Sequence, residues 1–434
     1  MKYKNIMSEF RHLSIIAIML TLILRAGAQD PVSLDFCYNQ ISKTYPLIRQ
    51  AALFDNSNKL KIKNLNKIHL PSLNVNGSAT WQNEITQVSI NLPSPFPKIN
   101  TPVIPQDQYK LTLDINEAIY DGHLTSYQKK LEDYNLQVDQ DNVAVTLYQL
   151  KDQINQFFFN LLLVRQNILL LEESKKQLES KLKEVESAVQ NGAMLRMNAD
   201  LIRAEIIKLD QNIVELSSDR RVSIRMLSEL ISFPMDDKTE FLKPEITISS
   251  TEYENKRLEF ELFGIQKNRI NLMKNMVTTK WNPRLLAFGQ FGLGRPGYDF
   301  LSSDIAPMVM VGAKLTWNPW NWNANKNEKK IYDIQNDIIK NQQETFDKNL
   351  KISSQKDLGE IDKFASLIAG DEQIIDLRTK ITKTASSQLD NGVITSADYI
   401  TRLNEEMQSR LNLEIHKIKL IRAKVSYLFT LGKL

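Results

Sequence analysis

The sequence predicts an α+β membrane protein made of two internal repeats, in which four strands continue into very long helices. Three observations predict this fold. Four segments alternate between apolar and polar residues, two long segments carry an apolar seam with a helical period, and the same order of signals occurs twice. The chain has 434 residues, 42% of them hydrophobic, with only 14 Gly and 14 Pro, which favours long regular elements over turns.

The N-terminal segment 1–28 is predicted to be a secretory signal peptide. Lys2, Lys4 and Arg11 precede an apolar run from Leu13 to Leu24, and Ala26-Gly27-Ala28 supplies a cleavage site of small residues. The run is shorter than the roughly 20 residues that span a bilayer, which argues against the alternative of a membrane anchor. After residue 28 we find no stretch long and apolar enough for a transmembrane helix, so any membrane insertion must use strands.

Four strands are predicted at about 72–83, 108–118, 284–294 and 308–318. In the first, Leu73, Val75, Gly77, Ala79 and Trp81 fall on one face and polar residues on the other. The other three strands repeat the rule, the third more weakly. In an exported chain this alternation fits a barrel with lipid outside and water inside.

Each repeat has the order short helix, strand, loop, strand, long helix, turn, helix. The first repeat is assigned to 29–232, the second to 251–434, and the segment 233–250 to a linker between them. Asn191-Gly192 recurs 200 residues later as Asn391-Gly392, and these two pairs mark the predicted helical tips. An internal duplication explains this register better than chance.

The long helices are predicted at about 124–189 and 326–390. Val143, Leu150 and Phe157 begin a series of apolar residues spaced seven apart that runs to Val185, with a second series interleaved. Such a seam predicts coiled-coil packing, and a helix of this length reaches roughly 100 Å at 1.5 Å per residue. Helices of about half this length are predicted at 33–69 and 198–232.

An aromatic belt is predicted where strands meet helices. All five tryptophans lie in or beside the strands, and none lies in the long helices. Trp317, Trp320 and Trp322 end the fourth strand and Tyr120 ends the second, as a belt at a membrane interface requires.

Several classes of function are excluded by composition. One Cys rules out a disulfide framework and a Cys-based zinc site, and four scattered His leave little for metal chemistry. The net charge is +4, of which the first 28 residues supply +3, so the remainder carries about +1 and no nucleic-acid footprint. Gly292-Leu-Gly294-Arg-Pro-Gly297 fits a dinucleotide-loop pattern but lacks a following helix signal. No catalytic residues, metal ligands or cofactor are predicted, and the chain is not expected to be an enzyme.

With this layout the sequence resembles the TolC family of outer-membrane efflux and secretion channels. The resemblance covers nearly the whole mature chain and rests on the duplicated order together with local signatures. These are Leu70-Pro71-Ser-Leu73 entering a strand, Ala118-Ile-Tyr-Asp-Gly122 and Trp317-Asn-Pro-Trp320 leaving strands, and the two Asn-Gly turns.

The resemblance implies a homotrimer in the outer membrane whose twelve-stranded barrel continues into a periplasmic helical tunnel. It also implies a passive exit duct that works with a periplasmic adaptor and an inner-membrane pump. From strand counting alone, four strands cannot close and roughly eight are needed, so the chain must oligomerise, as a dimer or as a trimer.

The resemblance also implies roles at the tips. Gly192 and Gly392, with Asn191 and Asn391, are expected to dock the adaptor. Asp398 matches an acidic gate position of the family, whereas Leu389, Ile394 and Thr401 replace other gate residues, which makes the usual lock of the gate doubtful. Asn198 and Asp200 are the candidates for the gate in the first repeat. The other interpretation of Asp398 is a helix cap.

Two alternatives come from other classes of protein. The first is a periplasmic coiled-coil adaptor that bridges two membranes without forming a pore. The second, a surface hydrolase, is disfavoured by the missing catalytic constellation.

Overall fold

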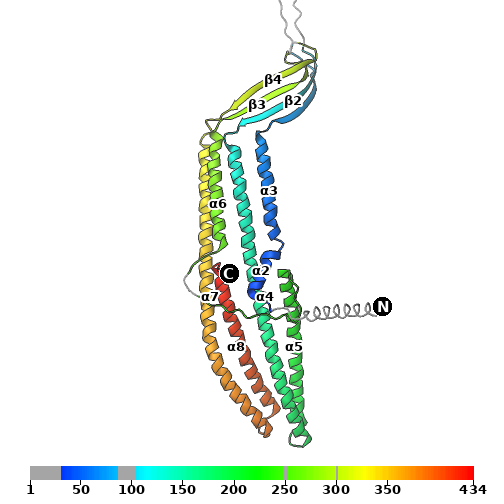
Figure 1. Ribbon diagram of the computed structural model, residues 1–434, viewed down its shortest axis with the longest axis vertical. Helices are drawn as coiled ribbons and strands as arrows, with labels where there is room; N and C mark the ends of the chain where they lie inside the picture. The colour runs from blue at the N-terminus through cyan, green and yellow to red at the C-terminus, as the bar shows by residue number, and fades with distance from the viewer. Residues whose placement is uncertain (1–30, 87–103, 249–252, 300–301) are drawn as a thin grey trace, which may run out of the picture. The chain divides into compact units, whose positions relative to one another are not determined.

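The computed structural model describes residues 31–86, 104–248, 253–299 and 302–434, so the predicted signal peptide 1–28 lies outside the described residues. The chain divides into two compact units (Figure 1). Unit 1 takes in the chain up to Ile48, Ala144–Leu258 and Asp347–Leu434, and unit 2 takes in Arg49–Val143 and Glu259–Phe346. Each unit draws on both predicted repeats.

Unit 2 contains a four-stranded antiparallel sheet in the order β1-β2-β3-β4. The strands are β1 (Ser72–Trp81), β2 (Asp107–Tyr120), β3 (Arg284–Arg295) and β4 (Ala306–Thr316). All four predicted strands are present, with ends that differ by one or two residues. β4 ends at Thr316 because its partner Arg284 is the first residue of β3, so Trp317 lies just beyond the strand rather than inside it.

One face of the sheet is apolar across all four strands. Paired residues share a face, so the alternation of each strand is continued by its neighbour. This face is made of Leu73, Val75, Gly77, Ala79 and Trp81 of β1, Tyr109, Leu111, Leu113 and Ile115 of β2, Leu285, Ala287, Gly289, Phe291 and Leu293 of β3, and Val309, Val311, Ala313 and Leu315 of β4. Much of it is exposed, including Val75 and Val311 at 73% each.

The opposite face carries polar groups that bind one another across strands. The Asp114 carboxylate accepts hydrogen bonds from Asn76 Nδ2 at 2.5 Å and from Gln290 Nε2 at 2.7 Å. A Cβ at Gly292 would lie 2.1 Å from the Leu111 carbonyl oxygen, so β3 needs glycine at this close approach to β2. Gly292 and Gly294 are thus strand residues, in agreement with the rejection of a dinucleotide loop.

The sheet is joined to helices within unit 2. α3 (Ile48–Asn66) and the 3₁₀ turn η1 (Lys67–His69) precede β1, while α6 (Leu258–Met276) and η2 (Val277–Trp281) precede β3. The first parts of α4 (Leu124–Gln190) and α7 (Ala324–Asp390) follow β2 and β4. Lys61 of α3 forms an ion pair with Glu132 of α4 at 2.8 Å.

The continuous helix predicted at 33–69 is wrong. The structure has α2 (Leu34–Thr44) and then α3, separated by Tyr45, Pro46 and Leu47. Pro46 provides no backbone N–H, and it forces the preceding residue out of the helical region, so Tyr45 is extended at φ −64° and ψ 133°.

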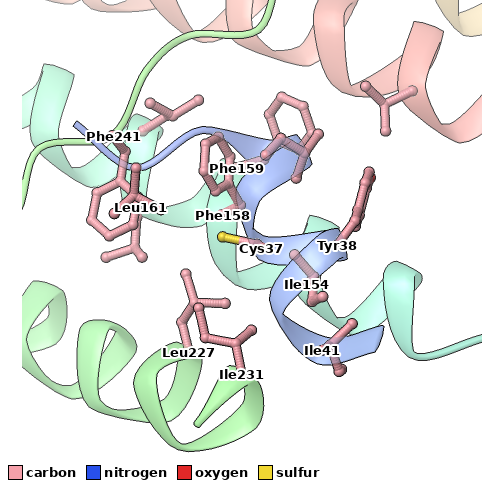
Figure 2. Packing of buried hydrophobic residues seen from close by; sticks show 14 of the residues in the cluster. Cys37, Tyr38, Ile41, Ile154, Phe158, Phe159, Leu161, Leu227, Ile231 and Phe241 are labelled. Atoms are coloured by element: carbon pink, nitrogen blue, oxygen red, sulfur yellow. The ribbon is translucent and has the colours of Figure 1, made fainter. Parts of the chain in front are cut away.

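The core of unit 1 packs α2 against α4, α5 (Arg196–Ile231) and α8 (Ser396–Thr430). Figure 2 shows Cys37 and Ile41 of α2 among Ile154, Phe158 and Leu227, and all five side chains are at most 1% exposed. Burial raises the pKa of the Cys37 thiol to about 12, as expected for an inert, buried cysteine. Cys37, a free cysteine, is thus a small buried residue of this core.

The seam of α4 is buried or half-buried along its length. Leu150, Leu161, Leu171, Leu178 and Val185 are each at most 8% exposed. One 18-residue window of α4 is apolar enough, by length and composition, to cross a membrane, which corrects the statement that no such stretch follows residue 28. The same helix supplies Ile154, Phe158 and Phe159 to the core of unit 1.

The segment assigned to a linker, 233–250, has little regular structure where it is described. Its Phe241 is 4% exposed and forms a parallel bridge with Val32.

A second core of unit 1 joins α4, α5, α7 and α8, and includes Leu178, Ile202, Leu389 and Leu403. This second core lies next to the two predicted tips.

Candidate functional site

The two predicted tips are tight turns between long helices. The first connects α4 to α5 through residues 191–195, and the second connects α7 to α8 through residues 391–395. Gly192 has φ +72° and Gly392 has φ +70°, in the left-handed region that favours glycine. No atom lies within 4 Å of a Cβ built on either residue, so backbone conformation and not crowding selects glycine here.

The hydrogen bonds of the two turns match. The N–H of Gly192 donates to the Val189 carbonyl at 3.1 Å, and the N–H of Gly392 donates to the Leu389 carbonyl at 3.0 Å. Within the turns, Leu195 and Val393 are about 70% exposed (71% and 69%). Each tip therefore presents an exposed apolar side chain on its turn.

Asp398 caps the second tip helix. Its Oδ2 accepts hydrogen bonds from the Thr395 hydroxyl at 2.7 Å and the Thr395 N–H at 3.0 Å, and Thr395 Oγ1 accepts from the Asp398 N–H at 3.2 Å. This is a capping box. The hydrogen bonds from Thr395, side chain first and then backbone, hold the pKa of the Asp398 carboxyl below its ordinary value. The capping role left open by the sequence is present.

Asn198 joins the two tips. It stands at the place in α5 that Asp398 has in α8, but the N-cap residue of α5 is Leu195, which has no side-chain oxygen for capping. Asn198 Oδ1 instead accepts a hydrogen bond from the backbone N–H of Ser396 at 3.0 Å. A side chain of α5 therefore accepts a hydrogen bond from one of the backbone N–H groups that the first turn of α8 leaves without a partner inside the helix.

Asp200 lies in a network of exposed charges on α4 and α5. Its carboxylate is 3.1 Å from Arg203 Nη1 and 3.8 Å from Arg196 Nε. Arg203 also pairs with Glu186 of α4 at 2.6 Å. The structure thus brings Asn198 and Ser396 into direct contact, whereas Asp200 and Asp398 make separate local contacts.

Sequence reasoning missed an ion pair beneath the tips. Lys181 of α4 is 3.0 Å from Asp390 at the end of α7 and 2.5 Å from Glu184 of its own helix. The Lys181 side chain is 8% exposed, and its Nζ lies 5.8 Å from the centre of the Tyr399 ring. Because the partners are 209 residues apart, no local spacing predicts the pair; the only signal was a lysine beside the apolar seam.

The predicted aromatic belt lies at the end of the sheet where helices begin. Tyr120 is the last residue of β2, while Trp317, Trp320 and Trp322 lie in the connection from β4 to α7. These four side chains are 37%, 59%, 68% and 84% exposed. Trp317 Nε1 donates a hydrogen bond to the Trp281 carbonyl oxygen at 3.0 Å. The rings of Trp320 and Trp322 pack edge to face, with their centroids 5.7 Å apart.

In the part of the chain that the structure describes, no group of three or more His, Cys, Asp or Glu is placed to hold a metal ion. The acidic residues of the tips are each engaged with hydroxyl, amide or basic partners. The described residues of the tips therefore present tight turns and paired charges.

No protein-family model and no curated protein matches the sequence. Solved structures do match the fold. CusC, described with its folding and transmembrane channel formation, is 13% identical, with a TM-score of 0.67 over 94% of this chain and 95% of that chain.

Two further solved structures agree. The outer membrane protein VceC of Vibrio cholerae is 12% identical, with a TM-score of 0.65 over 92% of this chain and 96% of that chain. The MtrE outer membrane channel of Neisseria gonorrhoeae in its open state is 12% identical, with a TM-score of 0.65 over 92% of this chain and 88% of that chain. At this identity the likeness concerns the fold.

Proposed function

We propose that this chain, which has the fold of the TolC-family outer-membrane channels that its sequence resembles, is an outer-membrane exit duct. The observation that carries the proposal is the sheet. Its four strands present one continuous apolar face, much of it exposed. The other face is polar on β1 and β2 and mixes polar with apolar residues on β3 and β4. Lipid against one face and water against the other would satisfy both.

The sheet also supports assembly. Its edge strands are β1 and β4, whose outer backbone groups have no partner strand among the described residues. Within a bilayer every such group must be paired, and four strands are too few to close a barrel. When β4 of one copy pairs with β1 of the next, a head-to-tail ring results. We propose a homotrimer with twelve strands, in line with the resemblance.

The tips support the docking proposal. Gly192 and Gly392 hold turns from which Leu195 and Val393 project into solvent. These surfaces would bind a periplasmic adaptor, which would connect the duct to an inner-membrane pump. Energy for transport would come from the pump.

Asp398 is proposed to line the periplasmic opening in addition to capping α8. Its depressed pKa keeps the carboxylate charged at neutral pH. Copies of one carboxylate around a symmetry axis would favour cations. Asn198 and Asp200 would lie close to the same opening.

The test of the duct is insertion and conductance. Full-length protein purified from outer membranes should migrate differently on a gel before and after heating, and should form discrete conductance steps in a planar bilayer. Protein that remains in the soluble periplasmic fraction and never conducts would overturn the duct and favour the adaptor alternative.

A further inference from the structure

The connection from β4 to α7 exposes far more aromatic surface than a water-facing turn should. Trp320 and Trp322 are 68% and 84% exposed, and their rings contact each other edge to face. Trp317 continues the apolar face of β4, since it follows Val309, Val311, Ala313 and Leu315 at the same period. Tryptophan combines an apolar ring with a polar N–H, and is favoured where a membrane meets water.

Trp322 is exposed on a backbone that disfavours it. Trp322 has φ +52° and Asn323 has φ +65°, two consecutive residues in the left-handed region. The equivalent position 200 residues earlier is Gly122, where φ is +71° and a Cβ would lie 2.9 Å from Asn282 Cβ. The second repeat thus has a bulky aromatic residue where the first has glycine. A side chain kept at a strained and exposed position is evidence of a use for it.

Lysines without counter-ions follow the tryptophans. Lys326, Lys329 and Lys330 lie on adjacent positions of one face of the first turns of α7. The intervening acid, Glu328, is engaged by Lys280 at 2.7 Å. In the described ranges Lys326 and Lys330 form no ion pair, and Lys329 lies 5.9 Å from the centre of the Trp281 ring. Positive charge is therefore left uncompensated directly beside the exposed rings.

From this juxtaposition we infer that Trp317, Trp320, Trp322, Lys326, Lys329 and Lys330 form a binding surface for anionic phospholipid headgroups, which we name the tryptophan–lysine patch. The inference rests on the proposed function, since it needs the sheet to lie in a bilayer. The rings would lie at the level of the headgroups, and the ammonium groups would bind phosphate oxygens. A free phosphate would use the lysines alone, whereas a lipid explains both the cations and the exposed rings.

The patch sets the depth of the channel in the membrane. β4 ends and α7 begins on either side of the patch, so in the proposed membrane the lipid-facing residues of β4 would end where the patch begins. In the proposed orientation this is the periplasmic leaflet. An anionic lipid that holds this rim would fix the base of the barrel at the interface.

The experiment measures lipid preference in vesicles. Full-length protein carrying Trp81→Phe, which leaves four tryptophans at this end of the sheet, is reconstituted into phosphatidylcholine vesicles. A minor share of the lipid is brominated phosphatidylglycerol in one set and brominated phosphatidylcholine in the other. Stronger quenching of tryptophan fluorescence by the anionic lipid reports its enrichment at the patch.

Two variants test the parts of the patch. Lys326→Gln/Lys329→Gln/Lys330→Gln should remove the preference, with a loss of about fivefold for each lysine, equivalent to about 1 kcal/mol per basic residue. The matched control Lys340→Gln/Lys348→Gln/Lys383→Gln removes the same charge further along α7 and should leave the preference for the anionic lipid unchanged. Trp322→Gly should weaken the preference without loss of thermal stability, because glycine accepts φ +52°.

The outcomes separate the inference from the proposed function. Channels that conduct in both vesicle types but are quenched equally by both brominated lipids would overturn the patch and leave the duct standing. Protein that inserts into neither vesicle would overturn the duct, and the patch with it. Loss of the preference when inorganic phosphate is added at constant ionic strength would show a free-anion site and would also overturn the lipid assignment.

Discussion

Lys181 of α4 and Asp390, the last residue of α7, form an ion pair between the two predicted repeats, with Lys181 Nζ 3.0 Å from Oδ1 and 3.2 Å from Oδ2. Asn198 and the Ser396 N–H make a second link at 3.0 Å. Glu205 Oε1 accepts a third from Asn404 Nδ2, also at 3.0 Å. These contacts connect the helices of the first tip to those of the second within one chain.

Asp390→Asn should loosen the connection between the tips. The Lys181 side chain is 8% exposed and the Asp390 side chain is 47% exposed, so solvent screens the pair and its loss should cost about 1 kcal/mol. Hydrogen exchange at residues 187–198 and 387–398 should become faster. Asp376→Asn, which breaks an exposed pair on the same helix, is the control and should leave these amides unchanged.

Asp398→Asn should alter ion selectivity while the fold is kept, because Thr395 remains the N-cap residue of α8 and an asparagine amide oxygen can still accept a hydrogen bond from it. We expect the reversal potential in a salt gradient across a planar bilayer to shift toward weaker cation preference. Asp200→Asn is the comparison in the first repeat. Reversal potentials that equal those of the unaltered channel would remove Asp398 from the gate and leave it a capping residue.

Gly192→Ala and Gly432→Ala should differ in cost although both residues have φ near +70° (+72° and +74°). At Gly192 the new Cβ contacts no neighbouring atom, so only backbone strain lowers the free energy of unfolding, by about 1 kcal/mol. At Gly432 the Cβ would lie 2.4 Å from the carbonyl carbon of Lys256, which adds about 1–3 kcal/mol of crowding. Urea midpoints would measure the difference, and equal midpoints would contradict it.

Gly392→Lys should impair docking of a partner but spare insertion, because the turn projects into solvent. The control is Gly392→Asn, since asparagine tolerates the left-handed region and adds no charge. Both variants should retain heat-modifiable migration. Cross-linking in cells from a photoreactive residue at position 393 should fall only for the lysine variant. Loss of insertion in both would mean that the glycine serves folding.

Acid should weaken the packing of α7 on α8 through Glu406. Burial alone would raise the pKa of this carboxyl, but the donors Thr382, Arg410 and Thr379 outweigh it and hold the pKa below the ordinary 4.5. A lowered pKa gives stability that is fully present above about pH 4.5 and is lost as the pH falls through the folded value. Urea unfolding at a series of pH values should show this loss of stability. Glu406→Gln should lower the free energy of unfolding by about 1–3 kcal/mol at pH 7 and should make it less dependent on pH in the acid range.

The sequence predicted the features that depend on local periodicity. Strict alternation identified all four strands and the apolar face, and the repeated Asn-Gly pairs identified both turns, since each signal lies within a few residues. The break at Pro46 is also a local signal, because a proline inside a helical segment ends or kinks the helix, yet the helix predicted at 33–69 ran through it. The Lys181–Asp390 and Asn198–Ser396 contacts could not be predicted, since they join residues about 200 positions apart.

The unpaired outer edges of β1 and β4 have a kinetic consequence. In the proposed assembly, the outer backbone groups of β1 and β4 would form their hydrogen bonds only when copies of the chain meet. The yield of folded protein should therefore rise with chain concentration, while dilute chains should remain open to proteolysis or to pairing with the wrong edge. Secretion of this chain and its maturation are thus expected to be separate events, with the second limited by encounter.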